Sequence, residues 1–204
     1  MVNFEDALVE ELVRVHGAHT VLLYGSRARG DATAESDVDV VAFAPVPETV
    51  RDARTWREMI LDAFIQPTAS AELTEIDQLK LVGARVLLDE RKLAEPLLQR
   101  LEALLKTGPT PLVETEARMR RVWAHKMLAR AERGDLEANY RRAWLLYQIL
   151  EDHFALQGRW YPGPKRAFGE LERETPLLHA AFARALAPNA PHQALVDLVE
   201  LVIR

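Results

Sequence analysis

The stretch LLYGSRARGDATAESDVDVV, residues 22–41, decides the fold of the first half of this chain. An apolar run ends at Gly25-Ser26, and Asp37 and Asp39 open a second apolar run after ten intervening residues. Successive side chains on a strand point to opposite faces of the sheet. The two aspartates are therefore expected side by side on one face, with the valines between and after them on the other.

This arrangement of residue types suits a metal site beside a phosphate site. Two adjacent carboxylates raise each other's pKa unless a cation lies between them. Oxygen ligands suit Mg²⁺, which usually takes one or two carboxylates together with substrate phosphates. Gly25 allows a tight turn, and Ser26 can cap a helical turn whose free N–H groups attract phosphate. Arg27 and Arg29 add positive charge to the same loop.

The composition is that of an ordinary soluble protein, and it excludes several other classes. Of the 204 residues, 49% are hydrophobic and 28% are charged. The net charge of −5 argues against general nucleic-acid binding. With no Cys, the chain has no disulfide framework and no thiolate zinc site. The N-terminus does not resemble a signal peptide, and no apolar run reaches membrane-span length, so a cytoplasmic location is expected.

Charge and aromatic content divide the chain near its middle. The first 108 residues have a net charge of −7 and the rest +2, and three of the four Trp lie in the second half. The sequence TGPTP, residues 107–111, is typical of a linker. We therefore predict two domains, residues 1–106 and 112–204.

Hydrophobic periodicity predicts different secondary structure in the two domains. The first domain should hold a small mixed β-sheet with flanking helices and the second an all-α helical bundle, so the fold class is α+β. In the first domain the predicted helices are 3–16, 49–65, 74–83 and 90–106, and the predicted strands are 19–24, 37–43, 69–73 and 84–88. In the second domain the predicted helices are 113–133, 135–157, 165–173, 176–187 and 191–203.

The Gly-Ser and Asp-x-Asp pattern resembles the signature of the nucleotidyltransferase superfamily, which includes DNA polymerase beta. The sequence GSRARGDATAESDVDV is especially similar to the minimal nucleotidyltransferases and to the kanamycin-type antibiotic nucleotidyltransferases. The resemblance covers residues 20–43 closely and residues 1–106 in the order of elements. The helical half shows only a general likeness to a bundle-type C-terminal domain.

The resemblance implies roles for the residues of both motifs. Gly-Ser would bind the triphosphate of a nucleotide, and the two aspartates would hold two Mg²⁺ ions. Asp37 and Asp39 are therefore our candidate catalytic and metal-binding residues. The candidate nucleotide-binding residues are Gly25, Ser26, Arg27, Arg29, Ser36 and Lys165.

The family also implies a third carboxylate on a later strand. Glu72 is the acid in the predicted strand 69–73, so it is our candidate for a third metal ligand and catalytic residue. The alternative is that Glu72 is a solvent-facing edge residue. Glu75 and Asp77 are better explained as charges at a helix start, and Asp62 falls inside the predicted helix 49–65.

Two interpretations of the loop GRWYPGP, residues 158–164, stay open. In one, Lys165 reaches the triphosphate while Trp160 and Tyr161 line a base or acceptor pocket. In the other, Pro164 begins a helix, the aromatic residues belong to the core and the basic pair that follows is solvated.

Two further patterns lie in the predicted bundle. Glu151, or its neighbour Asp152, could act as general base for an acceptor hydroxyl, as a bundle carboxylate does in the antibiotic-modifying relatives; the alternative is a solvated acidic face. Arg120 and His125 fit the R-x4–6-H spacing of HEPN ribonucleases. Chance matches are frequent in such an Arg-rich helix, so we favour amphipathic packing with exposed arginines.

The sequence thus predicts a Mg²⁺-dependent nucleotidyltransferase that uses ATP. It would move AMP to a hydroxyl of a small molecule, such as an aminoglycoside-like antibiotic, and release pyrophosphate. The alternatives are AMP transfer to a protein partner of the toxin–antitoxin type and a catalytically silent nucleotide-binding protein. The site would be closed by the chain's own bundle or by that of a second copy in a homodimer.

Overall fold

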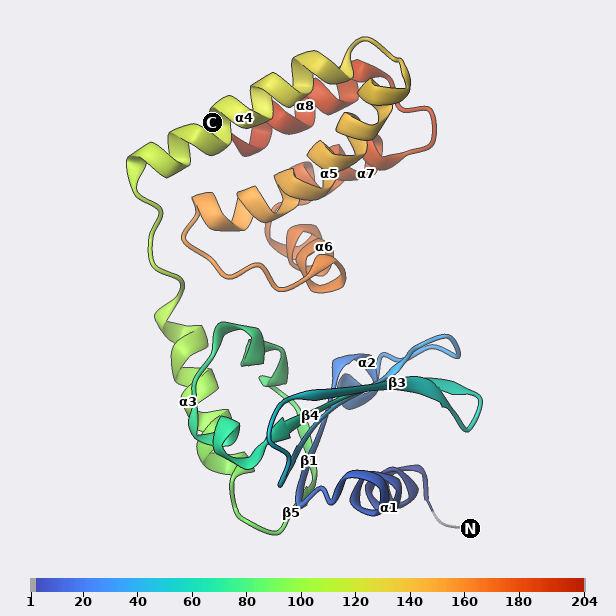
Figure 1. The fold of residues 1–204 in the computed structure, drawn as a ribbon. Helices are drawn as coiled ribbons and strands as arrows, with labels where there is room; N and C mark the ends of the chain where they lie inside the picture. Colours follow the sequence, from blue (N-terminus) through green and yellow to red (C-terminus); the bar gives the residue numbers. More distant parts are fainter. Residues whose placement is uncertain (1–2, 204) are drawn as a thin grey trace. The chain divides into compact units, whose positions relative to one another are not determined.

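The computed structural model describes residues 3–203, so the outer ends of the two predicted domains, residues 1 and 204, lie outside the described part. The chain divides into two compact units, Met1–Thr107 and Gly108–Arg204. The first combines a mixed sheet with helices, and the second is helical (Figure 1). The predicted α+β fold class is confirmed.

A five-stranded sheet forms the centre of the first unit. Its strand order is β3-β4-β2-β1-β5, in which β2 and β4 are parallel and the other neighbouring pairs are antiparallel. The strands are β1 (Thr20–Tyr24), β2 (Val38–Ala44), β3 (Val50–Trp56), β4 (Met59–Pro67) and β5 (Arg85–Asp89). The predicted strands 19–24, 37–43 and 84–88 are confirmed as β1, β2 and β5.

Helices cover both faces of this sheet. They are α1 (Phe4–His16), α2 (Gly25–Arg29), the 3₁₀ helices η1 (Thr68–Glu72) and η2 (Ile76–Leu81), and α3 (Ala94–Thr107). Leu8 and Leu12 of α1 pack in one core with alternate residues of β2 and β4. Leu81 of η2 and Leu97 of α3 pack in a second core with Leu22 and Val41 of the opposite sheet face. The aspartates predicted to bind metal lie on this second face.

The ends of α1 and α3 follow from capping. Asn3 Oδ1 accepts the Glu5 N–H at 2.7 Å, and Gly17 caps the end of α1 at His16, in agreement with the helix predicted at 3–16. The carboxylate of Asp89 accepts the N–H groups of Leu93 and Ala94 at 2.9 and 3.0 Å. The helix predicted from residue 90 therefore begins later, at Ala94.

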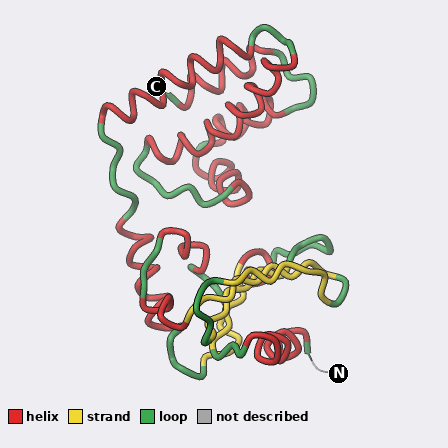
Figure 2. The backbone as a smooth tube through the Cα atoms, in the orientation of Figure 1, coloured by secondary structure: helices red, strands yellow, loops and turns green. Residues whose placement is uncertain are grey.

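The predicted helix at 49–65 is wrong, because this segment forms the antiparallel hairpin of β3 and β4 (Figure 2). Apolar residues at 56, 59, 60 and 64 fit a helical spacing. The same segment also alternates, since Leu61, Ala63 and Ile65 are fully buried while their neighbours are not. Parallel pairing with β2 buries that alternating face, and this tertiary contact decides the structure.

The predicted strand at 69–73 is also wrong. Thr68–Glu72 forms the short 3₁₀ helix η1, which begins directly after Pro67 at the end of β4. The short helix predicted at 74–83 is present as η2. The strand that lies beside β2 and parallel to it is therefore β4. A third carboxylate is then expected on β4 and not at residues 69–73.

Five helices make up the second unit: α4 (Glu114–Ala131), α5 (Leu136–Leu156), α6 (Pro164–Glu174), α7 (Pro176–Leu186) and α8 (His192–Val202). All five predicted helices are confirmed within two residues at each end. Their shared core is centred on Phe154, Phe182 and Leu195, which are fully buried. Within residues 3–203, none of the helices has the length and apolar content needed to cross a membrane.

Candidate functional site

Three acidic side chains lie at the edge of the sheet where β1 ends and β2 begins. Asp37 directly precedes β2, and Asp39 is its second residue. Asp39 is the register partner of Tyr24 on β1 and of Asp62 on β4. Register partners point to the same face of a sheet, so Asp39 and Asp62 present adjacent carboxylates.

The turn after β1 touches this acidic group directly. Gly25 has a φ of +73°, and a Cβ at this position would lie 2.1 Å from Asp39 Oδ2. A side chain is therefore excluded both by the backbone conformation and by the neighbouring carboxylate. Gly25 also begins α2, and the N-cap residue Tyr24 gives no side-chain cap to the first-turn N–H groups.

The electrostatics of Asp39 indicate a shortage of positive charge. Burial raises the pKa of Asp39, and the charges of Asp37 and Asp62 raise it further. Arg29 and Lys80 oppose this effect only in part, since the pKa stays above its ordinary value. A divalent cation among these carboxylates would relieve the repulsion, so the residues present fit an oxygen-ligated metal.

Asp62 is held by an arginine in this structure. Arg51 Nε donates to Asp62 Oδ1 at 2.8 Å, and its Nη2 donates to Oδ2 at 2.9 Å. This bidentate pair holds the pKa of Asp62 below its usual range. Within residues 3–203, no three acidic, His or Cys side chains come together as a ready-made metal-binding group.

Asp62 was not among the predicted ligands, because residues 49–65 were predicted to form a helix. Glu72, the residue predicted as the third ligand, is exposed at the last position of η1. The strand on which that prediction depended does not exist. The alternation of buried residues along β4 was the one signal that could have identified Asp62.

Lys80 is a second residue of this site that was not predicted from the sequence. It extends from η2, and its Nζ lies over two aromatic rings, 4.1 Å from the Phe64 centroid and 5.3 Å from the Tyr24 centroid. Burial lowers its pKa, while Asp77, Asp62 and Asp39 act in the opposite direction. Its position depends on how η2 folds back over the sheet, and no local sequence pattern signals that.

The loop between α2 and β2 uses several of the predicted nucleotide-binding residues for its own hydrogen bonds. Arg27 donates to the carbonyls of Asp37 at 3.1 Å and Ser36 at 2.7 Å. Ser36 Oγ accepts the Thr33 N–H at 2.8 Å. Arg29 lies 3.3 Å from a carboxylate oxygen in the same loop, that of Asp31. These bonds fix the loop beside the acidic group, and the binding of a nucleotide by these residues stays a prediction.

The candidates of the helical unit lie on α5 and α6. Glu151 on α5 accepts from Gln148 Nε2 at 3.3 Å and raises the pKa of Tyr147 through a hydrogen bond. Lys165 is the second residue of α6, and the helix begins at Pro164 as the second interpretation expected. Tyr161 packs against the bundle core, which also agrees with that interpretation.

Two side chains of this unit that were expected to be exposed to solvent, Asp152 and Arg120, are not. Asp152 is buried, and Arg120 Nη1 donates to its Oδ1 at 2.7 Å. Arg120 therefore belongs to a partly buried ion pair rather than to an exposed basic face. His125 is exposed on α4.

Comparison with known proteins agrees with the geometry of the sheet. A family model described as "Nucleotidyltransferase domain" matches residues 6–108. A solved structure, that of a nucleotidyltransferase-like protein from Exiguobacterium sibiricum 255-15, is similar with 12% identity and a TM-score of 0.44, over 98% of this chain and 73% of that one. No curated protein gives a significant match. The chain belongs to the nucleotidyltransferase superfamily, whose activity is the transfer of nucleotidyl groups.

Proposed function

We propose that this protein is a Mg²⁺-dependent nucleotidyltransferase that moves AMP from ATP to a hydroxyl of a small molecule. The observation that carries the proposal is the position of Asp39, which lies next to Asp62 in the sheet, feels the charge of Asp37 and touches the Gly25 turn. A family member that keeps three carboxylates next to its phosphate loop has the groups that in-line nucleotidyl transfer requires.

Asp37, Asp39 and Asp62 would hold two Mg²⁺ ions. When bound, the metal would supply an activated acceptor hydroxyl and charge stabilisation for the leaving pyrophosphate. Asp62 replaces Glu72 in this proposal, because its strand position is adjacent to Asp39. The bidentate bond from Arg51 would keep Asp62 ionised and oriented until the metal arrives.

The nucleotide would be bound mainly by the turn after β1. The first-turn N–H groups of α2 and the Ser26 hydroxyl would donate to the triphosphate, and Arg29 would add charge. The bonds from Arg27 to the following loop would hold Asp37 near those phosphates. Lys80, fixed by Tyr24 and Phe64, would neutralise part of the acidic charge before metal binds.

The helical unit would contribute to the acceptor side. Glu151 is proposed as the base for the acceptor hydroxyl, and Lys165 as a ligand of the triphosphate. Either role requires the bundle of the same chain or of a second copy to close on the sheet unit. An amine-rich, hydroxylated acceptor such as an aminoglycoside is our first choice.

The test is pyrophosphate release from ATP and Mg²⁺ with a panel of hydroxylated acceptors. Asp39→Asn and Asp62→Asn should each lower turnover at least about 100-fold, because each removes charge that the transition state needs. Glu72→Gln is the matched control and should leave turnover nearly unchanged. Normal turnover in Asp39→Asn would rule out the mechanism, and loss only in Glu72→Gln would return the third-ligand role to Glu72.

A second candidate is a silent nucleotide-binding protein, which is favoured by one observation. Arg51 bonds both oxygens of Asp62, and a metal ligand needs at least one of them. Binding of Mg²⁺-ATP without pyrophosphate release, for every acceptor and also in Arg51→Gln, would support this candidate over the enzyme.

A further inference from the structure

The helical unit contains a pocket that the proposed function does not use. It lies between α4 and α5 and has a volume of about 400 Å³. Every lining residue comes from these two helices, so the pocket is complete within the second unit. Its walls are apolar and aromatic, and its polar groups are three charged side chains and the amide of Gln148.

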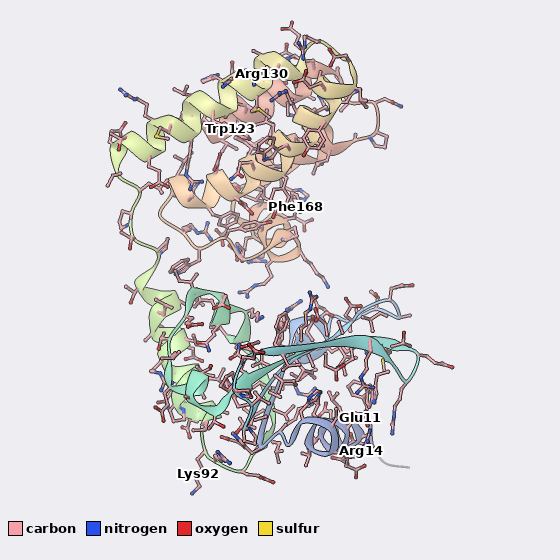
Figure 3. The ribbon with its side chains drawn as sticks, in the orientation of Figure 1. Glu11, Arg14, Lys92, Trp123, Arg130 and Phe168 are labelled. Carbon is pink, nitrogen blue, oxygen red and sulfur yellow. The ribbon has the colours of Figure 1, made fainter. Side chains whose placement is uncertain are left out.

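Two tryptophans form the aromatic wall. Trp123 of α4 lies on the side that faces α5 (Figure 3), and its ring meets that of Trp144 edge to face, with centroids 5.4 Å apart. Trp144 is 46% exposed and Met119, on the α4 side, is 68% exposed. Trp144 and Met119 therefore offer apolar and π surface to a ligand, while Trp123 also packs against the bundle core.

A buried carboxylate lies at the polar end of the pocket. The side chain of Asp152 is 2% exposed. Arg120 and Gln148 both donate to its Oδ1, at 2.7 and 3.2 Å, and among residues 3–203 no hydrogen bond reaches Oδ2. Oδ2 is not one of the buried side-chain atoms without a partner in this part of the chain, so it keeps contact with solvent and is free to accept from a ligand.

The charge of the pocket is negative. Arg120 also bonds Glu116, at 3.2 Å, so one guanidinium serves two carboxylates. An anionic ligand would meet the two carboxylates. Both Nη atoms of the guanidinium that could attract it are already bonded, and its Nε, which has no acceptor among the described residues, is buried away from solvent. A neutral apolar ligand would leave Asp152 Oδ2 without a donor.

We propose that the α4–α5 pocket binds an organic cation, a primary or substituted ammonium group on a small apolar or aromatic body. The ammonium N–H would donate to Asp152 Oδ2, and the positive charge would lie against the indole rings. The apolar body would cover Met119 and Trp144. The inference goes beyond the proposed function, because it requires neither the nucleotide nor the sheet unit.

The test is calorimetric titration of the full-length protein with three probes of one size, benzylamine, benzyl alcohol and benzoate. Benzylamine should bind about tenfold or more tightly than benzyl alcohol, and benzoate should not bind. Equal affinity for the amine and the alcohol, or no binding of the amine, would overturn the proposal.

Matched variants locate the binding. Trp144→Leu and Glu116→Gln should each weaken benzylamine about threefold to tenfold, since they remove π surface and negative charge. Tyr147→Leu and Glu114→Gln change an exposed aromatic and an exposed acid on the same helices outside the pocket, and should have no effect. Loss in these controls, or no loss in the pocket variants, would contradict the assignment.

Asp152→Asn should abolish the preference for the amine over the alcohol. Circular dichroism checks its fold, and if it is unfolded the Trp144 and Glu116 variants decide the question. A second copy of the chain could occupy the pocket instead, so the oligomeric state of the free protein is measured by analytical sedimentation. A dimer that Trp144→Leu dissociates would assign this face to a second copy and overturn the proposal.

Discussion

Gly25 shows how one missing side chain shapes the candidate site. Two positions after β1, Gly25 and Gly30, share a left-handed backbone with φ of +73° and +81°. Their surroundings differ, because a Cβ on Gly25 would meet Asp39 while nothing lies within 4 Å of one on Gly30. Comparing substitutions at the two positions therefore separates the backbone cost of an added side chain from its steric clash with Asp39.

We expect Gly25→Ala to abolish Mg²⁺-ATP binding and Gly30→Ala to retain it. Both variants should lose about 1–2 kcal/mol of stability, because Ala is disfavoured at positive φ. Gly25→Ala should lose more, since the Asp39 carboxylate must move. Thermal unfolding and nucleotide titration measure the two effects, and equal behaviour of the variants would show that the contact with Asp39 does not matter.

Asp39 makes the metal-free protein sensitive to pH. Its pKa in the folded state is raised above the ordinary 3.8 by burial and by Asp37 and Asp62. Folding therefore takes up protons between the two values, and stability falls as pH rises through the folded-state pKa. Asn mimics the protonated carboxyl at every pH.

In EDTA at neutral pH, Asp39→Asn should unfold at a higher temperature than the wild type, and this difference should shrink as the pH falls toward 3.8. Mg²⁺ should stabilise the wild type and leave the variant unchanged. Thermal melts across this range measure both effects. A less stable variant at neutral pH would mean that Asp39 gains more from its neighbours than it loses by burial.

At the scale of elements, the β3–β4 hairpin marks the limit of prediction from sequence. α1, β1, β2 and β5 carry local signals, such as the Asn3 cap and short apolar runs, and were predicted. The hairpin turn is formed by Arg57 and Glu58, with φ of 48° and 67°, instead of the Asn-Gly or Asp-Gly pair that identifies such turns. Without that signal the helical spacing was preferred, and Asp62 was misplaced with it.

Relieving this turn should stabilise the protein. Glu58→Gly should raise the free energy of unfolding by about 1 kcal/mol, because Gly adopts positive φ without steric cost. Glu48→Gly, at an exposed loop position without positive φ, is the control and should lower stability. Chemical denaturation measures both, and destabilisation by Glu58→Gly would show that its side chain matters more than its backbone.

At the scale of the whole molecule, each unit has its own hydrophobic core. The segment that joins α3 to α4 has no helix or strand, and each of its residues is exposed or half-buried. Thermolysin should therefore cut near Leu112 and release two fragments that stay folded, as judged by circular dichroism. First cuts within β3 or α5 would mean that one unit depends on the other for stability.

Arg51 lies on the edge strand β3, so it affects more than the candidate site. Arg51, Asp52 and Arg54 place a row of charges on the open margin of the sheet, where another chain could otherwise add a strand. Arg51 is also the partner of Asp62. A substitution of Arg51 that frees this carboxylate would also remove a charge that keeps molecules apart, so the availability of Asp62 and the solubility of the protein are coupled through a single guanidinium.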